Sequence, residues 1–249
     1  MNALATPEHA AVAAPAQAAL RFLTAGSVDD GKSTLIGRLL LDSRAILADQ
    51  LDQLHARAAA SGEAAPDLSL LTDGLEAERE QGITIDVAWR YFATPARKFV
   101  IADAPGHEQY TRNMVTAAAG SDAVVVLVDI TKLDLAQPEP ALLPQTRRHA
   151  LLAQLLRVDH LVFAVNKIDA VADPGEAFRR VAGALERFAR EAALPLAGIV
   201  PVSALRGDNV AQRRPAPWYD GPALLELLEA LPNAREPHQA PLALPVQYV

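Results

Sequence analysis

A glycine-rich segment near the start of the chain constrains the fold more than any other feature of the sequence. Residues 26–33 read Gly-Ser-Val-Asp-Asp-Gly-Lys-Ser, which matches the pattern G-x-x-x-x-G-K-[ST]. The segment follows a short apolar run and precedes residues with helical periodicity. A loop between a strand and a helix can direct its backbone N–H groups at phosphate oxygens. The sequence therefore predicts a phosphate-binding α/β unit rather than a glycine turn that only caps a helix.

Several residue types in this loop suit a nucleotide and its metal ion. Lys32 is expected to neutralise β- and γ-phosphate oxygens, and the Ser33 hydroxyl to bind Mg²⁺. The chain has only four lysines, which favours a specific role for Lys32. Asp29 has two interpretations: a side chain bonded to its own loop, which we favour, and a ligand for a monovalent cation. The predicted nucleotide-binding residues here are Gly26, Ser27, Val28, Asp29, Asp30, Gly31, Lys32, Ser33 and Thr34.

Apolar runs and helical segments alternate along the rest of the chain. The predicted strands are residues 20–25, 85–92, 98–102, 123–129, 160–166 and 198–203. The predicted helices are residues 32–41, 44–60, 110–119, 144–156, 176–192 and 222–231. Such alternation predicts an α/β fold, with a mostly parallel six-stranded sheet and helices on both faces. Residues 85–92 alternate in polarity, so we expect them at an edge, antiparallel to residues 98–102.

Composition excludes several classes of protein. Apolar residues make up 51% and charged residues 21% of 249 residues, which is typical of a folded domain. Without cysteine there is no disulfide, thiolate metal site or cysteine nucleophile. The net charge of −7 argues against nucleic acid as the main partner. No apolar run is long enough to cross a membrane, and no secretion signal is visible, so we expect a cytoplasmic protein.

The two ends of the chain differ from its centre. Residues 1–19 are rich in alanine and lack lysine and arginine, which favours a disordered leader. Residues 20–231 are predicted to form the nucleotide-binding domain. Four prolines lie between residues 232 and 245, so residues 232–249 are expected to be a linker and the first strand of a further domain.

A second group of candidate residues follows the strand predicted at 98–102. Asp103 stands at the end of that strand, where ligands of open α/β sheets gather, and is expected to hold Mg²⁺, although alone it would be taken as a helix cap. Gly106 can donate its N–H to a γ-phosphate. Thr84 is expected to complete the Mg²⁺ shell, an assignment that depends on the neighbouring motifs. The predicted nucleotide-binding residues here are Asp103, Ala104, Pro105, Gly106 and His107.

A third group predicts the choice of base. Asn166, Lys167, Ile168 and Asp169 close the strand at 160–166. A carboxylate at Asp169 can accept hydrogen bonds from both N1–H and the 2-amino group of guanine, a donor pair that adenine lacks. The Lys167 stem can cover the base, and Asn166 can tie neighbouring loops together. Ser203, Ala204 and Leu205 lie at the end of the last predicted strand, where the Ala204 N–H can reach guanine O6, although alone they would be taken as a plain turn.

These motifs together resemble a known class of nucleotide hydrolases. Residues 103–107 are similar to the Asp-x-Pro-Gly-His motif of translation-factor GTPases, which implies the G-domain fold of P-loop GTPases and a His107 that positions the attacking water. Residues 71–86, 107–114 and 217–221 resemble the GTPase subunit of bacterial sulfate adenylyltransferase more narrowly. Ala104 stands where that family usually has Thr, and the segment 130–144, with three prolines, is longer than usual.

The resemblance implies an activity, cofactors and a partner, and it implies that the domain whose first strand is expected in residues 232–249 is a β-barrel. The expected cofactors are GTP and Mg²⁺. A separate small adenylyltransferase subunit would make adenylyl sulfate from ATP and sulfate, driven by GTP hydrolysis in this chain. The alternative is a translation-factor GTPase that acts on tRNA or the ribosome. Salt-sensitive binding of RNA would favour this alternative. A small-molecule kinase is disfavoured because Asp169 suits guanine.

Overall fold

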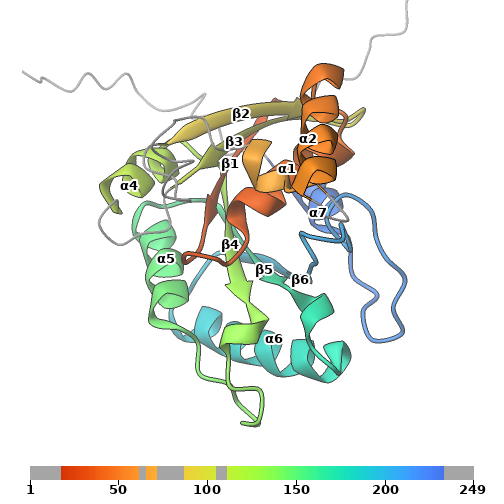
Figure 1. The fold of residues 1–249 in the computed structure, drawn as a ribbon. Helices are drawn as coiled ribbons and strands as arrows, with labels where there is room; N and C mark the ends of the chain where they lie inside the picture. The colour runs from red at the N-terminus through yellow and green to blue at the C-terminus, as the bar shows by residue number, and fades with distance from the viewer. Residues whose placement is uncertain (1–17, 62–65, 72–86, 105–110, 233–249) are drawn as a thin grey trace, which may run out of the picture.

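The computed structural model describes residues 18–61, 66–71, 87–104 and 111–232 (Figure 1). Within these ranges a six-stranded sheet lies between two layers of helices. Nearly all of the expected leader and C-terminal linker lies outside the described residues, so those two assignments stay predictions.

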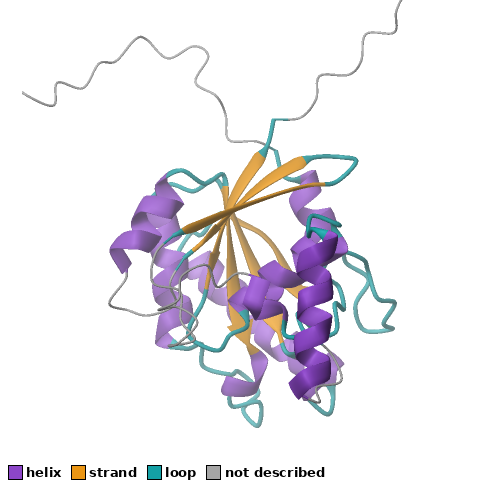
Figure 2. Ribbon diagram, turned by 45° about the horizontal axis from the view of Figure 1, so that its top comes forward, coloured by secondary structure: helices purple, strands orange, loops and turns teal. Residues whose placement is uncertain are grey.

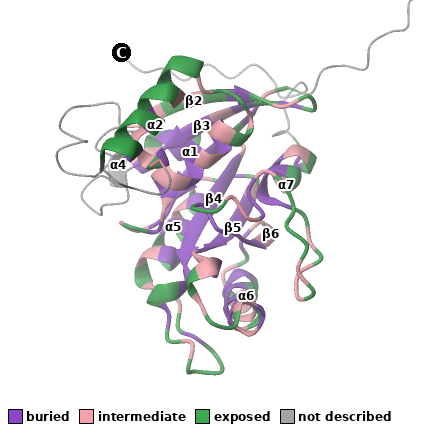
Figure 3. Cartoon of the chain, turned by 45° about the vertical axis from the view of Figure 1, so that its right-hand side comes forward, coloured by how far each residue is buried: buried purple, intermediate pink, exposed green. Residues whose placement is uncertain are grey.

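The sheet carries one antiparallel edge on an otherwise parallel core. Its strands are β1 (Leu20–Ala25), β2 (Ala88–Ala93), β3 (Lys98–Asp103), β4 (Ala123–Asp129), β5 (His160–Asn166) and β6 (Leu196–Pro201). Their order is β2-β3-β1-β4-β5-β6, and only the β2/β3 pair is antiparallel. The apolar strands β4 and β5 are almost wholly buried because helices cover both of their faces (Figure 3). The predicted mostly parallel sheet, with an antiparallel hairpin at its edge, is confirmed.

Helices pack on both faces of this sheet, as the sequence predicts (Figure 2). They are α1 (Lys32–Asp42), α2 (Ala48–Ser61), α4 (Thr111–Ala119), α5 (Pro144–Leu155), α6 (Pro174–Glu191) and α7 (Leu224–Ala230), with short 3-10 turns at Leu68–Leu71, Ile130–Lys132 and Ile168–Ala170. Side chains of α4, α5 and α6 share one buried cluster with the sheet, and those of α1 and α7 share another. No helix in the described part of the chain is long and apolar enough to cross a membrane.

Several element boundaries differ from the prediction for local reasons. The second helix begins at Ala48 rather than residue 44, because Arg44 has a left-handed φ of 57° and ends α1 instead. The helix α6 begins two residues earlier than predicted, at Pro174, because the Asp173 side chain accepts a hydrogen bond from the N–H of Glu176 and caps it. The last strand lies two residues earlier than predicted.

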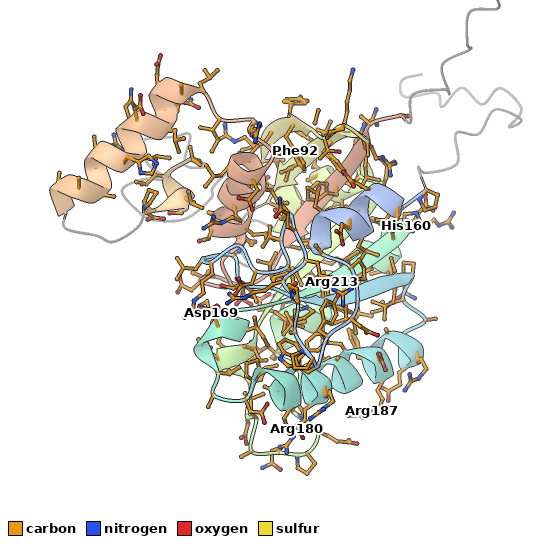
Figure 4. All side chains as sticks on the ribbon, turned by 90° about the vertical axis from the view of Figure 1, so that its right-hand side faces the viewer. Phe92, His160, Asp169, Arg180, Arg187 and Arg213 are labelled. Carbon is orange, nitrogen blue, oxygen red and sulfur yellow. The ribbon has the colours of Figure 1, made fainter. Side chains whose placement is uncertain are left out.

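The long connection between β4 and α5 is docked on α6. Arg180 donates to the carbonyl oxygen of Leu135 at 2.9 Å, and Arg187 lies 3.2 Å from a carboxylate oxygen of Glu139. Leu133 is buried at the base of the same connection. Figure 4 shows Arg180 and Arg187 along the same lower side of α6. The three prolines therefore belong to a loop with defined contacts.

Candidate nucleotide-binding site

The predicted motifs meet at the carboxyl ends of the parallel strands. The phosphate loop joins β1 to α1, Asp103 ends β3, and Asn166 ends β5. A pocket of about 280 Å³ lies between the loop, residues 166–170 and residues 204–205. Ligands of open α/β sheets bind at this edge because successive loops converge there.

Gly31 brings the phosphate loop against the base-reading side of the pocket. Its φ is +89°, a backbone conformation that side-chain-bearing residues adopt at a cost. A Cβ atom at this position would collide with the side-chain amide of Asn166. The glycine is therefore required by its conformation and by its close approach to a second motif.

The charge of Lys32 is held inside the loop. Its ammonium donates to the carbonyl oxygens of Gly26 and Ser27, at 3.0 and 2.7 Å. Burial lowers the pKa of Lys32, while the negative charges of Asp103 and Asp30 oppose that shift. The lysine thus stands at the point where the motif predicts the phosphates, with a charge that an anion would stabilise.

Asp30 closes the loop, a role that the sequence prediction had considered for the neighbouring Asp29. One carboxylate oxygen of Asp30 accepts the N–H of Ser27 at 2.6 Å, and the other lies 2.8 Å from the ammonium of Lys132. Lys132 also donates to the carbonyl of Val28 at 2.6 Å. Asp29 is exposed, and neither of its two predicted roles is tested. The sequence prediction missed Lys132, although the scarcity of lysine applied to it as much as to Lys32.

Asp103 and Ser33 can supply protein ligands to Mg²⁺. Asp103 is 1% exposed, and its carboxylate accepts a long, 3.4 Å hydrogen bond from the hydroxyl of Thr24, which pairs with it across β1 and β3. No three His, Asp or Glu side chains converge in the described ranges. Mg²⁺ in nucleotide sites takes one or two protein oxygens together with phosphates and water, so this donor set fits the ion.

Asn166 links three parts of the site, as its sequence position predicts. Its Nδ2 donates to the carbonyl of Asp30 at 2.8 Å, and its Oδ1 accepts the N–H of Ala204 at 3.0 Å. The Ala204 N–H is thus directed at Asn166, and a bond from it to guanine O6 would have to share that donor. Ser203 is buried, and its hydroxyl accepts the N–H of Arg206 at 3.1 Å, which shapes the same turn.

Asp169 and Lys167 line the predicted base pocket. Asp169 is 13% exposed, and Arg206 lies 3.4 Å from one of its carboxylate oxygens. Lys167 has a left-handed φ of 62°, and its ammonium lies 2.7 Å from Asp129, the last residue of β4. Burial acts to raise the pKa of Asp129, but the nearby ammonium of Lys167 and the hydrogen bonds from Thr131 outweigh it and hold that pKa below its ordinary value. Asp129 and Arg206 are contacts that sequence reasoning missed.

The remaining predicted residues fall in two groups. Thr84, Pro105, Gly106 and His107 lie outside the described residues, so their predicted roles are not tested. Ala104 and Ile168 are buried beside the site. His149, which no motif includes, is buried on α5, where burial and the charges of Lys32 and Arg148 lower its pKa to about 4.

Together, the fold and the site define a class: a P-loop GTP-binding domain of the translation-factor type. The family model for the elongation factor Tu GTP binding domain matches residues 17–236, and the chain belongs to that family. The Ski7 GTPase-like domain of S. cerevisiae, bound to GDP and inorganic phosphate, superposes with a TM-score of 0.70 at 20% identity, covering 86% of this chain and 49% of the chain in that structure. That likeness shows the fold alone.

Curated relatives are more similar in sequence. The chain is 54% identical over 235 residues to sulfate adenylyltransferase subunit 1 of Cronobacter sakazakii, covering 92% of this chain and 48% of the relative. It is 49% identical over 233 residues to the protein of that name from Sulfurovum sp., with 92% and 47% covered. The chain therefore spans about half the length of the curated relatives it matches.

Proposed function

We propose that this chain binds and hydrolyses GTP with Mg²⁺ as the GTPase domain of a sulfate adenylyltransferase subunit. The observation that carries the guanine-nucleotide part is the shared pocket of the phosphate loop and Asp169. The sulfate-activation part is supported by relatives of about 50% identity that carry that name. The activity named for these relatives is assigned to this chain only as part of the proposal.

Lys32 and Ser33 perform the phosphate-binding part of the mechanism. When phosphate enters, the Lys32 ammonium exchanges its two loop carbonyls for phosphate oxygens, and backbone N–H groups of the loop bind the others. Ser33, Asp103 and Thr84 would hold Mg²⁺, which when bound would neutralise negative charge on the β- and γ-phosphates.

Base selection follows from Asp169. Its two oxygens accept the N1–H and 2-amino hydrogens of guanine, while adenine would leave the carboxylate without these donors. The fixed Asn166 sets the distance between this carboxylate and the phosphate loop through its bonds to Asp30 and Ala204. Selection of guanine therefore depends on the fixed distance between the phosphate loop and the loop that carries Asp169.

His107 is assigned the hydrolytic step. In the proposal it orients the water that attacks the γ-phosphorus, so that the bond to the β–γ bridging oxygen breaks and GDP and phosphate form. His107→Ala should slow single-turnover hydrolysis by roughly 100-fold while Mg·GTP affinity changes little, because the interaction exists only in the transition state. A large loss of affinity would instead make His107 a binding residue.

Adenylyl transfer is assigned to another polypeptide. In that reaction a sulfate oxygen bonds to the α-phosphorus of ATP and diphosphate leaves. The chain shows one G-x-x-x-x-G-K-[ST] segment, and its base pocket suits guanine. We infer a small adenylyltransferase subunit as the partner, with GTP hydrolysis here coupled to its reaction.

Reconstitution with purified components tests this assignment. This chain alone should hydrolyse GTP slowly and make no adenylyl sulfate from ATP and sulfate. A full-length relative that carries this domain, combined with a small subunit, should form adenylyl sulfate in a GTP-dependent manner. Product without a small subunit, or no dependence on GTP in the complex, would contradict the coupling. RNA binding that weakens steeply with salt would favour the translation-factor alternative.

A further inference from the structure

Two carboxylates beside the phosphate loop are buried as deeply as the apolar core. Asp30 and Asp129 are each 1% exposed. A buried carboxylate is costly unless a cation and hydrogen bonds compensate its charge. The chain has only four lysines, and two of them, Lys132 and Lys167, lie against these carboxylates.

The four charges form an alternating row across the site. The ammonium of Lys132 lies 2.8 Å from Asp30 and 3.9 Å from Asp129. The ammonium of Lys167 lies 2.7 Å from the same oxygen of Asp129. The other oxygen of Asp129 accepts the N–H and hydroxyl of Thr131, at 2.9 and 2.6 Å, which fixes the carboxylate. The row begins in the phosphate loop and ends in the base-reading segment.

Lys132 also controls the direction of a loop carbonyl. Its ammonium donates a hydrogen bond to the carbonyl of Val28, just as the ammonium of Lys32 donates to the carbonyls of Gly26 and Ser27. Three successive carbonyl dipoles of the loop are therefore bound by ammonium groups in this structure, and the bond from Lys132 to Val28 remains when Lys32 turns to the phosphates. A carbonyl held in this way does not point at an incoming anion, so N–H groups are left to face the phosphates.

We propose that Lys132 and Asp129 are positioning residues that couple the phosphate half of the site to its base half. Lys132 holds the loop through Val28 and Asp30, and Asp129 holds Lys132 and Lys167 together. At 3.9 Å Asp129 acts on Lys132 by charge rather than by a hydrogen bond, an effect that burial strengthens. The proposal rests on the proposed guanine-nucleotide site and concerns how that site is organised.

The direct test compares Lys132→Met with Lys98→Met. Lys98 is exposed at the start of β3, so its variant is a matched control for the loss of a lysine. Lys132→Met should bind GDP ~10-fold more weakly, the size of a lost charge-assisted hydrogen bond, and should lose less affinity for GMP, which lacks the β-phosphate. Lys132→Arg, which keeps charge and donors, should recover most of the GDP affinity. Equal GDP affinities for Lys132→Met and Lys98→Met would overturn the proposal.

Coupling is measured by a double-mutant cycle between Lys132→Met and Lys167→Met. With Asp129 present, their combined effect on GDP affinity should depart from the product of the single effects by about fivefold, the lower range for groups in one network. With Asp129→Asn as the background, the effects should multiply. Multiplication in both backgrounds would show two independent lysines and refute the coupling.

A charge-neutral variant covers the case in which Lys132→Met fails to fold. Asp30→Asn combined with Lys132→Met removes both charges of this ion pair, so Asp30 is not left buried without its cation, and the asparagine carbonyl can still accept the N–H of Ser27. This variant should fold and bind GDP about as weakly as expected for Lys132→Met. Wild-type affinity in it would refute the role of Lys132. Failure of the unmodified chain to bind GDP would instead overturn the proposed function, and this inference with it.

Discussion

The phosphate loop and the base-reading segments meet in one pocket but differ in what holds them in place. In the phosphate loop, ammonium groups bind backbone carbonyls, and the buried Asp30 pairs with Lys132. In the base-reading segments, neutral hydrogen bonds of Asn166 to Asp30 and Ala204 set the geometry. Asp169 is the carboxylate proposed to read the base, and it is partly paired with Arg206, while the ion pair of Lys167 with Asp129 joins this half to the charged row.

This difference predicts which perturbations each half tolerates. Interactions between buried charges are strong and respond to any change of net charge nearby. Neutral hydrogen bonds are weaker and depend mainly on geometry. Charge changes should therefore disturb phosphate recognition whatever base is bound, while changes at Asp169 should alter the choice of base alone.

The largest expected effect is that of Lys32→Met. Loss of its charged hydrogen bonds to phosphate should weaken binding of GTP and xanthosine triphosphate alike, by ~100-fold or more. Equilibrium titration of both nucleotides measures it, with Lys98→Met as the control. A loss confined to one base would contradict the division into two halves.

Asp169→Asn should act on the base half. GTP binding should weaken by roughly 10- to 100-fold because guanine loses a charged acceptor, whereas the asparagine NH₂ can donate to the C2 carbonyl of xanthine. Competition between GTP and xanthosine triphosphate reports the preference, and the ratio of GDP to GMP affinity should stay as in the unmodified protein. Retained preference for GTP would show that Asp169 does not read the base.

The next effect is pH dependence of stability from His149. Its pKa in the folded chain is about 4, below its ordinary 6.5, so the unfolded chain binds more protons between these values. The stabilisation is complete above about pH 6.5 and is lost as pH falls towards 4, by roughly 2 kcal/mol between pH 7 and pH 5. Urea unfolding of His149→Gln should lack this component. An unchanged pH slope would mean that the histidine is not held neutral.

Arg206→Ala should have the smallest effect. Arg206 is 58% exposed, so its ion pair with Asp169 is worth at most about 1 kcal/mol. Because it occupies an oxygen that guanine would need, its removal should speed GDP association by up to ~3-fold, and raised salt should do the same to the unmodified protein. Slower association would show that Arg206 orients Asp169 instead.

The sequence predicted the fold well because its signals were local. Apolar runs placed all six strands in chain order, and the polarity of β2 indicated an edge. The sequence did not determine which face of β2 is buried. Phe92 is 6% exposed and stacks on Phe99, while the adjacent Tyr91 is 70% exposed. Both residues are aromatic, so only the position of β3 decides between them.

The order of the motifs also determined where the site lies, because the carboxyl ends of parallel strands share one edge of the sheet. Tertiary structure alone decided how the charges there are paired. Lys132 meets Asp30 across 102 positions of sequence, and the N–H of Ala204 meets Asn166 across 38. Local propensities act over a few neighbouring residues, whereas these pairs exist only because β4, β5 and β6 bring distant loops together in a buried space where each charge and donor needs a partner.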